Sequence, residues 1–138
     1  MFIENNIKTE VIQSVFYRKF YRYFLHSEAG VIKWYQIIKL IRVFISWIIS
    51  ALFLSSKYLK KESPDIVHLN SSVLSDWAFA AKQIKIKTIC HIQEPIANGY
   101  FGLRKTILKK IFNYSADHII AISKDNAKRI NLPKKTTV

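Results

Sequence analysis

Between residues 64 and 123 the sequence repeats one pattern three times: a short β-branched run ends in a polar residue, and a helical segment follows. The three runs are residues 65–70, 86–91 and 118–123. Strands that alternate with helices of about 10 to 15 residues build a parallel sheet. Such sheets bind ligands just beyond the carboxyl ends of their strands. The pattern therefore predicts an α/β fold with a parallel sheet of about three strands and flanking helices, and it places candidate site residues at the strand ends.

Two helical segments precede this pattern. Residues 8–25 have apolar side chains at helical spacing and contain the aromatic and basic run 16–24, which predicts an amphipathic helix. A longer apolar helix follows from about residue 31 to 61. Its polar side chains fall on one narrow stripe, which we expect to face water while the rest of the helix packs on the sheet. This stripe consists of Gln36, Lys39, Arg42, Ser46, Ser50 and Lys57.

The composition limits the compartment and the partners. The uncharged interval between Arg42 and Lys57 is shorter than the ~20 residues of a bilayer span, so we expect a buried or interfacial helix there, with a transmembrane helix as the alternative. The first residues lack the basic and apolar regions of a secretion signal, and a lone cysteine inside an apolar run indicates a packed thiol in a reducing compartment such as the cytoplasm. A net charge of +13 predicts an anionic partner, either a membrane surface or a nucleic acid.

Several classes of site are excluded by their missing motifs. One Cys and four scattered His offer no zinc spacing. The sequence has neither a Gly-x-Gly-x-x-Gly turn nor a Gly-x-x-x-x-Gly-Lys loop, which argues against dinucleotide and P-loop sites. We therefore expect neither a metal ion nor a bound cofactor.

Four segments, taken in their order and spacing, resemble the amino-terminal domain of family-four GT-B glycosyltransferases. They are Pro64-Asp-Ile-Val-His-Leu-Asn-Ser-Ser72, Cys90-His-Ile-Gln-Glu-Pro95, Gly99-Tyr-Phe-Gly-Leu-Arg104 and Ala116-Asp-His-Ile-Ile-Ala-Ile-Ser-Lys124. The resemblance is best over residues 60–138 and weaker back to 31. It implies that residues 31–138 form part of a Rossmann-like acceptor domain, preceded by the amphipathic segment 1–30. It also implies a carboxyl-terminal donor-binding domain that this chain lacks.

The resemblance further implies an activity. Family members transfer a sugar from a nucleotide-sugar to an acceptor, with retention of configuration and generally without metal. For this chain we expect a hexosyltransferase fragment acting on a glycan or lipid-linked acceptor in surface polysaccharide synthesis. We expect it in the cytoplasm or on the inner face of the membrane, and inactive unless the missing domain is supplied in cis or in trans.

The predicted catalytic residues are His91 and Glu94. The resemblance places His91 at the mouth of the cleft, where a neutral imidazole can bond a sugar hydroxyl or the departing phosphate; a packed strand-end histidine is the alternative. Glu94 either orients an acceptor hydroxyl or caps its loop. We expect His68, inside its strand, to be structural and to pack under the cleft.

The predicted substrate-binding residues are Asn70, Ser71, Gln93 and Ser123. Amides and hydroxyls suit a polyhydroxylated ligand, although Asn and Ser are also common in turns. Gln93 stands where close relatives commonly have Arg, so it keeps hydrogen-bonding reach but loses the cation. For Ser123 we favour the alternative role, as the cap of the helix that follows it.

Two other functions fit the same sequence. The aromatic and basic helix and the basic segment 104–110 could serve a binding module, at an anionic membrane surface or on single-stranded nucleic acid. The chain could also be an inactive remnant. As partners of this chain we expect the nucleotide-sugar, the acceptor and an anionic membrane surface. We do not expect it to bind nucleic acid.

Overall fold

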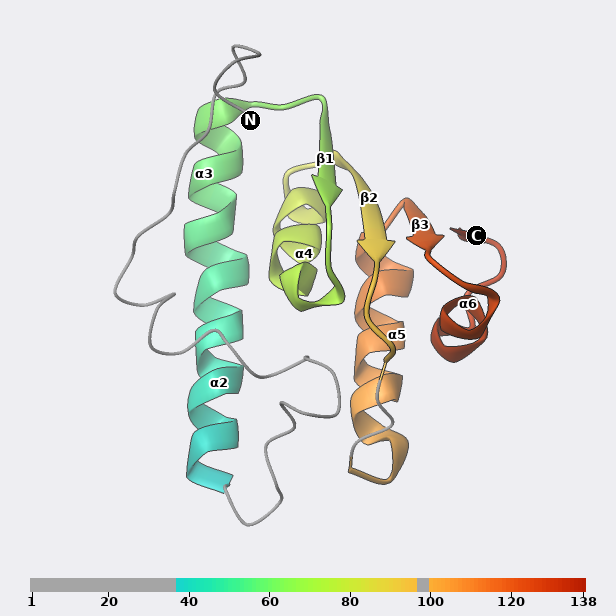
Figure 1. Ribbon diagram of the computed structural model, residues 1–138. Coiled ribbons are helices and arrows are strands. Elements are labelled where there is room, and N and C mark those ends of the chain that lie inside the picture. Colours follow the sequence, from blue (N-terminus) through green and yellow to red (C-terminus); the bar gives the residue numbers. More distant parts are fainter. Residues whose placement is uncertain (1–36, 97–99) are drawn as a thin grey trace, which may run out of the picture.

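The computed structural model describes residues 37–96 and 100–138 and shows an α/β fold with a parallel sheet (Figure 1). The predicted fold class is therefore confirmed. The amphipathic helix predicted over residues 8–25 lies outside the described residues.

A long helical segment comes first and ends where the sequence indicated. It consists of α2 (Ile37–Ile49), a π-helical stretch η3 (Ser50–Leu54) and α3 (Ser55–Glu62). Ser63 adopts a left-handed conformation, with φ of 46°, and its N–H donates to the Leu59 carbonyl oxygen at 2.8 Å. Pro64 then prevents continuation of the helix. The chain turns directly into the first strand.

The sheet has four parallel strands in the order β1-β2-β3-β4. They are β1 (Ile66–Leu69), β2 (Lys87–Ile92), β3 (His118–Ala121) and the short β4 (Thr136–Thr137). The first three occupy the three runs of the sequence pattern. Leu69 lies opposite Cys90, and Cys90 lies opposite Ile119. All four strands point the same way, so their carboxyl ends form one edge of the sheet.

The helices that connect the strands cover one face of the sheet. Between β1 and β2, a 3-10 turn η4 (Ser72–Leu74) leads into α4 (Ser75–Gln83). Between β2 and β3, a second 3-10 turn η5 (Tyr100–Gly102) leads into α5 (Leu103–Ser115). The helix α6 (Lys124–Ile130) connects β3 to β4. Right-handed crossovers that all step in one direction put their helices on the same side. Alternate strand residues therefore point into one core. This core includes Leu59, Val67, Leu69, Ala78, Ala81, Cys90, Ile92, Leu108, Phe112, Ile119 and Ile130.

The opposite face of the sheet is not closed in the same way. Parallel sheets usually have both faces covered. Here the strand residues that point away from the helices are all exposed or only half-buried. They are Ile66, His68, Lys87, Ile89, His91, His118 and Ile120.

The long helix is turned differently from the prediction. Of the polar stripe that we expected to face water, Arg42 and Lys57 are exposed, but Ser46 and Ser50 are buried, Ser50 completely. Val43 and Ala51 are buried as well, whereas other apolar side chains of the same helix point outward, with Ile38 74% and Phe53 66% exposed. The exposed apolar residues of α2 and η3 are Ile38, Ile41, Phe44, Ile45, Leu52 and Phe53.

A buried carboxyl group accounts for the inward position of Ser50. Asp76, in the first turn of α4, is completely buried and accepts hydrogen bonds from the hydroxyls of Ser50 and Ser55. The two serines also bond to each other at 3.1 Å. A π turn pairs residues five apart, and the N–H of Ser55 donates to the Ser50 carbonyl oxygen. The π turn thus aligns two hydroxyls on one carboxyl group, which cannot be buried without such partners.

The first turn of α5 also differs from the prediction. The sequence, with its basic segment 104–110, predicts apolar Leu103 inside and Arg104 outside, whereas in the structure Leu103 is exposed and Arg104 is buried. Arg104, Leu108 and Phe112 are four residues apart and lie on one stripe of the helix. Since Leu108 and Phe112 anchor that stripe in the core, Arg104 follows them inward.

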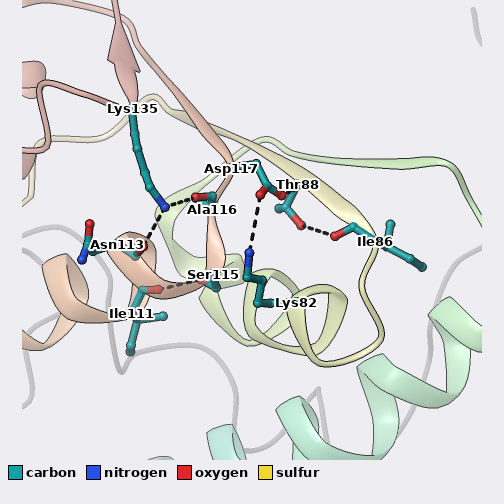
Figure 2. A network of polar contacts seen from close by, with 9 residues as sticks. All are labelled: Lys82, Ile86, Thr88, Ile111, Asn113, Ser115, Ala116, Asp117 and Lys135. Atoms are coloured by element: carbon teal, nitrogen blue, oxygen red, sulfur yellow. Dashed lines mark hydrogen bonds and ion pairs between the residues drawn. The ribbon is translucent and has the colours of Figure 1, made fainter.

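A polar network supports the end of the sheet opposite the strand exits, at the amino ends of β2 and β3 (Figure 2). Asp117 accepts a hydrogen bond from the N–H of Thr88 at 2.9 Å and lies 3.6 Å from the Lys82 amine. The Lys135 amine donates to the carbonyl oxygens of Asn113 and Ala116 at 2.6 and 2.7 Å. A cation at the last carbonyls of α5 complements the negative end of the helix dipole.

Candidate functional site

Polar side chains from β1 and β2 meet just beyond the carboxyl ends of these strands. Glu94 Oε1 accepts hydrogen bonds from the hydroxyls of Ser71 and Ser72, at 2.6 Å each, and from the N–H of Ser72 at 2.8 Å. Ser71 also accepts from the N–H of Val73, which makes it the cap of η4. One carboxylate oxygen therefore joins the exit of β2 to the exit of β1.

These contacts set the ionisation of Glu94. Partial burial works to raise the pKa of Glu94, but the hydrogen bonds from Ser71, Ser72 and the backbone outweigh it, and the pKa lies below its ordinary value. Glu94 is therefore an ionised hydrogen-bond acceptor at neutral pH. A base with a lowered pKa takes up a proton poorly, so this carboxylate is better suited to orienting a hydroxyl than to deprotonating it.

A second bridge lies beside the first. The Gln93 side-chain amide donates to the Asn70 Oδ1 at 2.6 Å, and both side chains are exposed. Each amide keeps one group without a partner among the described residues, the Asn70 Nδ2 and the Gln93 Oε1. Together they offer a donor and an acceptor to a ligand.

His91 and His68 form a stacked pair on the open face of the sheet. Their ring centroids are 6.1 Å apart with an interplanar angle of 19°. His91 is half-buried and His68 is exposed. The prediction that His68 packs under the cleft is therefore wrong: residues 66 and 68 of β1 point to the face without helices, because side chains alternate along a strand.

The structure brings most of the predicted site residues together, with one exception and one addition. Ser123 follows the next strand, and its hydroxyl accepts from the N–H of Asn126 at 3.1 Å, so it caps α6. Ser72, which follows Ser71 at the end of the same strand, supplies two of the three bonds to Glu94. The offset between β1 and β2, with Leu69 opposite Cys90, is the signal that pairs the Ser-Ser step with Glu94.

The described part of the chain holds no group of three or more His, Cys, Asp and Glu that could bind a metal ion. The available chemistry is hydrogen bonding. Within residues 37–96 and 100–138, the Asn70 Nδ2, the Gln93 Oε1 and the imidazole nitrogens of His68 and His91 have no hydrogen-bond partner, and Glu94 Oε2 has none from another residue. Several donors and acceptors at one edge match a ligand rich in hydroxyls.

Comparison with known proteins agrees with the fold. No curated protein and no solved structure matches the chain at a significant level. The family model of Glycosyltransferase Family 4 matches residues 12–135, which includes every described element from α2 to α6. The match covers most of the chain, and the protein accordingly belongs to glycosyltransferase family 4.

Proposed function

We propose that this domain binds the acceptor in the transfer of a sugar from a nucleotide-sugar donor, with a glycan or lipid-linked acceptor of surface polysaccharide synthesis. Family membership supports sugar transfer. The observation that carries the acceptor role is the pair of bridges at the ends of β1 and β2, Glu94 with Ser71 and Ser72, and Gln93 with Asn70.

The proposed roles follow from the hydrogen-bonding capacity that remains. Glu94 holds its position through Oε1 and accepts an acceptor hydroxyl at Oε2. Gln93 and Asn70 bind further hydroxyls. His91, supported by the stacked ring of His68, bonds a sugar hydroxyl or the departing phosphate. The cation clamp on the leaving diphosphate, which retaining hexosyl transfer requires, would come from a donor-binding domain in cis or in trans.

An NMR titration of the 138-residue chain tests this assignment without needing turnover. The probes are a panel of hexose disaccharides and UDP-glucose. We expect the disaccharides, at millimolar concentration, to shift the amide and side-chain signals of Asn70, Gln93 and Glu94 and the ring signals of His91. UDP-glucose should produce weaker shifts at the same signals.

A matched pair of variants separates the site from a general effect of sugar. Glu94→Gln should weaken the disaccharide shifts severalfold, because it replaces an ionised acceptor by a neutral one. Asp125→Asn changes an exposed carboxylate that pairs only with Arg129 on its own helix, and it should leave the shifts unchanged. The acceptor role is excluded if no disaccharide shifts the signals at the strand ends.

A further inference from the structure

The outer face of the long helix points to a second binding surface. A helix on the surface of a domain normally turns its apolar side inward. In this chain α2 and η3 bury two serines together with Val43 and Ala51, and they leave five large apolar side chains exposed: Ile38, Ile41, Ile45, Leu52 and Phe53. Large contiguous apolar surfaces of this kind mark interaction sites.

Helix geometry makes this face continuous. Ile38, Ile41 and Ile45 lie on one stripe of α2 because they are three and four residues apart. An unbroken α-helix would carry Phe53, eight residues after Ile45, about 80° away from that stripe. The wider turn of η3 (Ser50–Leu54) removes most of this offset, since π turns contain more residues than α turns.

The same stripe ends in positive charge. Lys57 and Lys60 follow Phe53 at four and seven residues and are exposed, as is their neighbour Lys61. The face is therefore mainly apolar over α2 and η3, with exposed Arg42 at its side, and cationic over α3. Apolar side chains beside exposed cations match the headgroup zone of an anionic membrane, where acyl chains and phosphates lie within one side-chain length of each other. The net charge of +13 favours the same surface over long range.

The contacts of the inner side determine how the helix would meet the bilayer. Among the described residues one segment, Ile41–Glu62, passes a length and composition test for a membrane span, a test that core helices also pass. Its inner side is held to α4 by the bonds from Ser50 and Ser55 to Asp76, and the Trp47 indole N–H donates to Ser75 at 3.0 Å. A span would break these bonds in hydrocarbon, whereas a helix lying in the plane of the surface keeps them.

The position of this face relates it to the candidate site. The 13, 5 and 8 residues of α2, η3 and α3 span roughly 40 Å, whereas the six residues of β2 span about 20 Å. Because α3 ends next to the start of β1, the first turns of α2 extend past the carboxyl ends of the strands (Figure 1). The start of α5, with exposed Phe101 and Leu103, lies toward the same end.

We propose that the face formed by Ile38, Ile41, Ile45, Leu52 and Phe53, with Lys57, Lys60 and Lys61, docks the domain in plane on an anionic lipid surface. Docking there sets the edge that carries Glu94 close to the headgroups. The lipid contact itself is independent of sugar transfer; only its use in presenting a lipid-linked acceptor rests on the proposed function.

Vesicle co-sedimentation of the full chain tests the docking. The vesicles contain phosphatidylcholine alone or phosphatidylcholine mixed with phosphatidylglycerol, at low and at high salt. We expect binding to the mixed vesicles at low salt and little binding to the neutral ones. Ile41→Asn/Ile45→Asn should lower the partition coefficient at least about tenfold, because two apolar side chains no longer enter the interface. Replacing Lys57, Lys60 and Lys61 with Gln should lower it by roughly fivefold for each lysine and weaken the salt dependence.

Ile66→Asn/Ile122→Asn is the matched control. These two isoleucines are 53% and 54% exposed, close to the 53% and 49% of Ile41 and Ile45, but they lie in β1 and just after β3, outside the proposed face. The control should bind like the wild type. Equal binding by the Ile41/Ile45 variant, or no binding of the wild type to mixed vesicles at low salt, overturns the proposal. So does a wild-type chain that ignores vesicles and forms dimers which the Ile41/Ile45 variant abolishes.

A fluorescent label gives a second readout that does not depend on affinity. Cys90 is fully buried, so a cysteine introduced on the surface can be labelled selectively. An environment-sensitive dye at Ile45→Cys should shift to the blue with mixed vesicles, and the same dye at Ile66→Cys should not. A shift at neither position, or at both alike, contradicts the proposed face. Loss of the disaccharide shifts with vesicle binding intact would instead count only against the proposed function.

Discussion

Replacing Glu94 with Gln tests whether an ionised carboxylate joins the exits of β1 and β2. Glu94 Oε1 accepts three hydrogen bonds, two from hydroxyls at 2.6 Å and one from the Ser72 N–H at 2.8 Å. A bond to a charged acceptor contributes about 1.5–3 kcal/mol and a neutral bond about 0.5–1.5 kcal/mol. The Gln oxygen keeps the shape and loses the charge. Since the side chain is only half-buried, we expect a total loss of about 1.5 kcal/mol in the free energy of unfolding.

Urea denaturation followed by circular dichroism measures this loss. With a denaturant slope of about 1.5 kcal/mol per M, the midpoint should fall by about 1 M at pH 7. The loss should also depend on pH. The folded pKa of Glu94 is held below its ordinary value of 4.5, because the hydrogen bonds outweigh burial. A carboxylate of this kind stabilises the fold above the unfolded pKa, and the stabilisation disappears as pH falls through the folded pKa. The difference between wild type and Glu94→Gln should therefore shrink below about pH 4.5.

Two outcomes would refute this reasoning. One is a Glu94→Gln protein as stable as the wild type at pH 7, and the other is a deficit that stays constant as the pH is lowered. Asp125→Asn serves as the control, because Asp125 is an exposed carboxylate that pairs with Arg129 one helical turn away. Such pairs contribute about 0.3–0.5 kcal/mol, so the control should remain near the wild type throughout.

Two substitutions and one labelling experiment test other supports of the fold. Asp76→Ala removes the acceptor of two buried hydroxyls and should lower the free energy of unfolding by about 2–4 kcal/mol in urea denaturation; a loss under about 1 kcal/mol contradicts the buried network. Lys135→Met removes two hydrogen bonds to the end of α5 and should cost about 1–2 kcal/mol, with faster amide hydrogen exchange there; unchanged exchange would show that the end of α5 does not depend on them. Burial, helped by the charge of Asp117, raises the pKa of the Cys90 thiol to about 12, so iodoacetamide at pH 8 should label Cys90 only after unfolding; rapid labelling of the folded chain would contradict its burial.

The strands and their edge could be predicted because their signals are local. Each β-branched run is short, ends in a polar residue and precedes a helix, which fixes the direction of the chain and the parallel pairing. Asn70, Ser71, His91, Gln93 and Glu94 follow directly as strand-exit residues. Their pairing does not follow from the same pattern, since it depends on the register between β1 and β2, and a shift of one residue would change every partner.

The orientation of the long helix could not be obtained from periodicity. Helical spacing shows that Ser46 and Ser50 share a stripe, but not which side of the helix the stripe faces. The deciding group is Asp76, which is distant in sequence and lies on another helix. His68 and Arg104 were misplaced for related reasons. The free face of the sheet exposes His68, and the spacing of Arg104 with Leu108 and Phe112 turns it inward.

The π turn connects the inner and the outer side of the long helix. Ser50 and Ser55 are five residues apart and meet Asp76 together only because the turn is wide. The same turn keeps Phe53 and Lys57 in line with Ile45. In a regular α-helix one of the two arrangements would be lost, since aligning the serines would rotate α2 by about one residue, or 100°, relative to α3. Because Pro64 fixes α3 to β1, the buried carboxyl group also sets which way the apolar residues of α2 face beyond the strand ends. A single internal contact thereby controls both the stability of the helix layer and the direction of its exposed face.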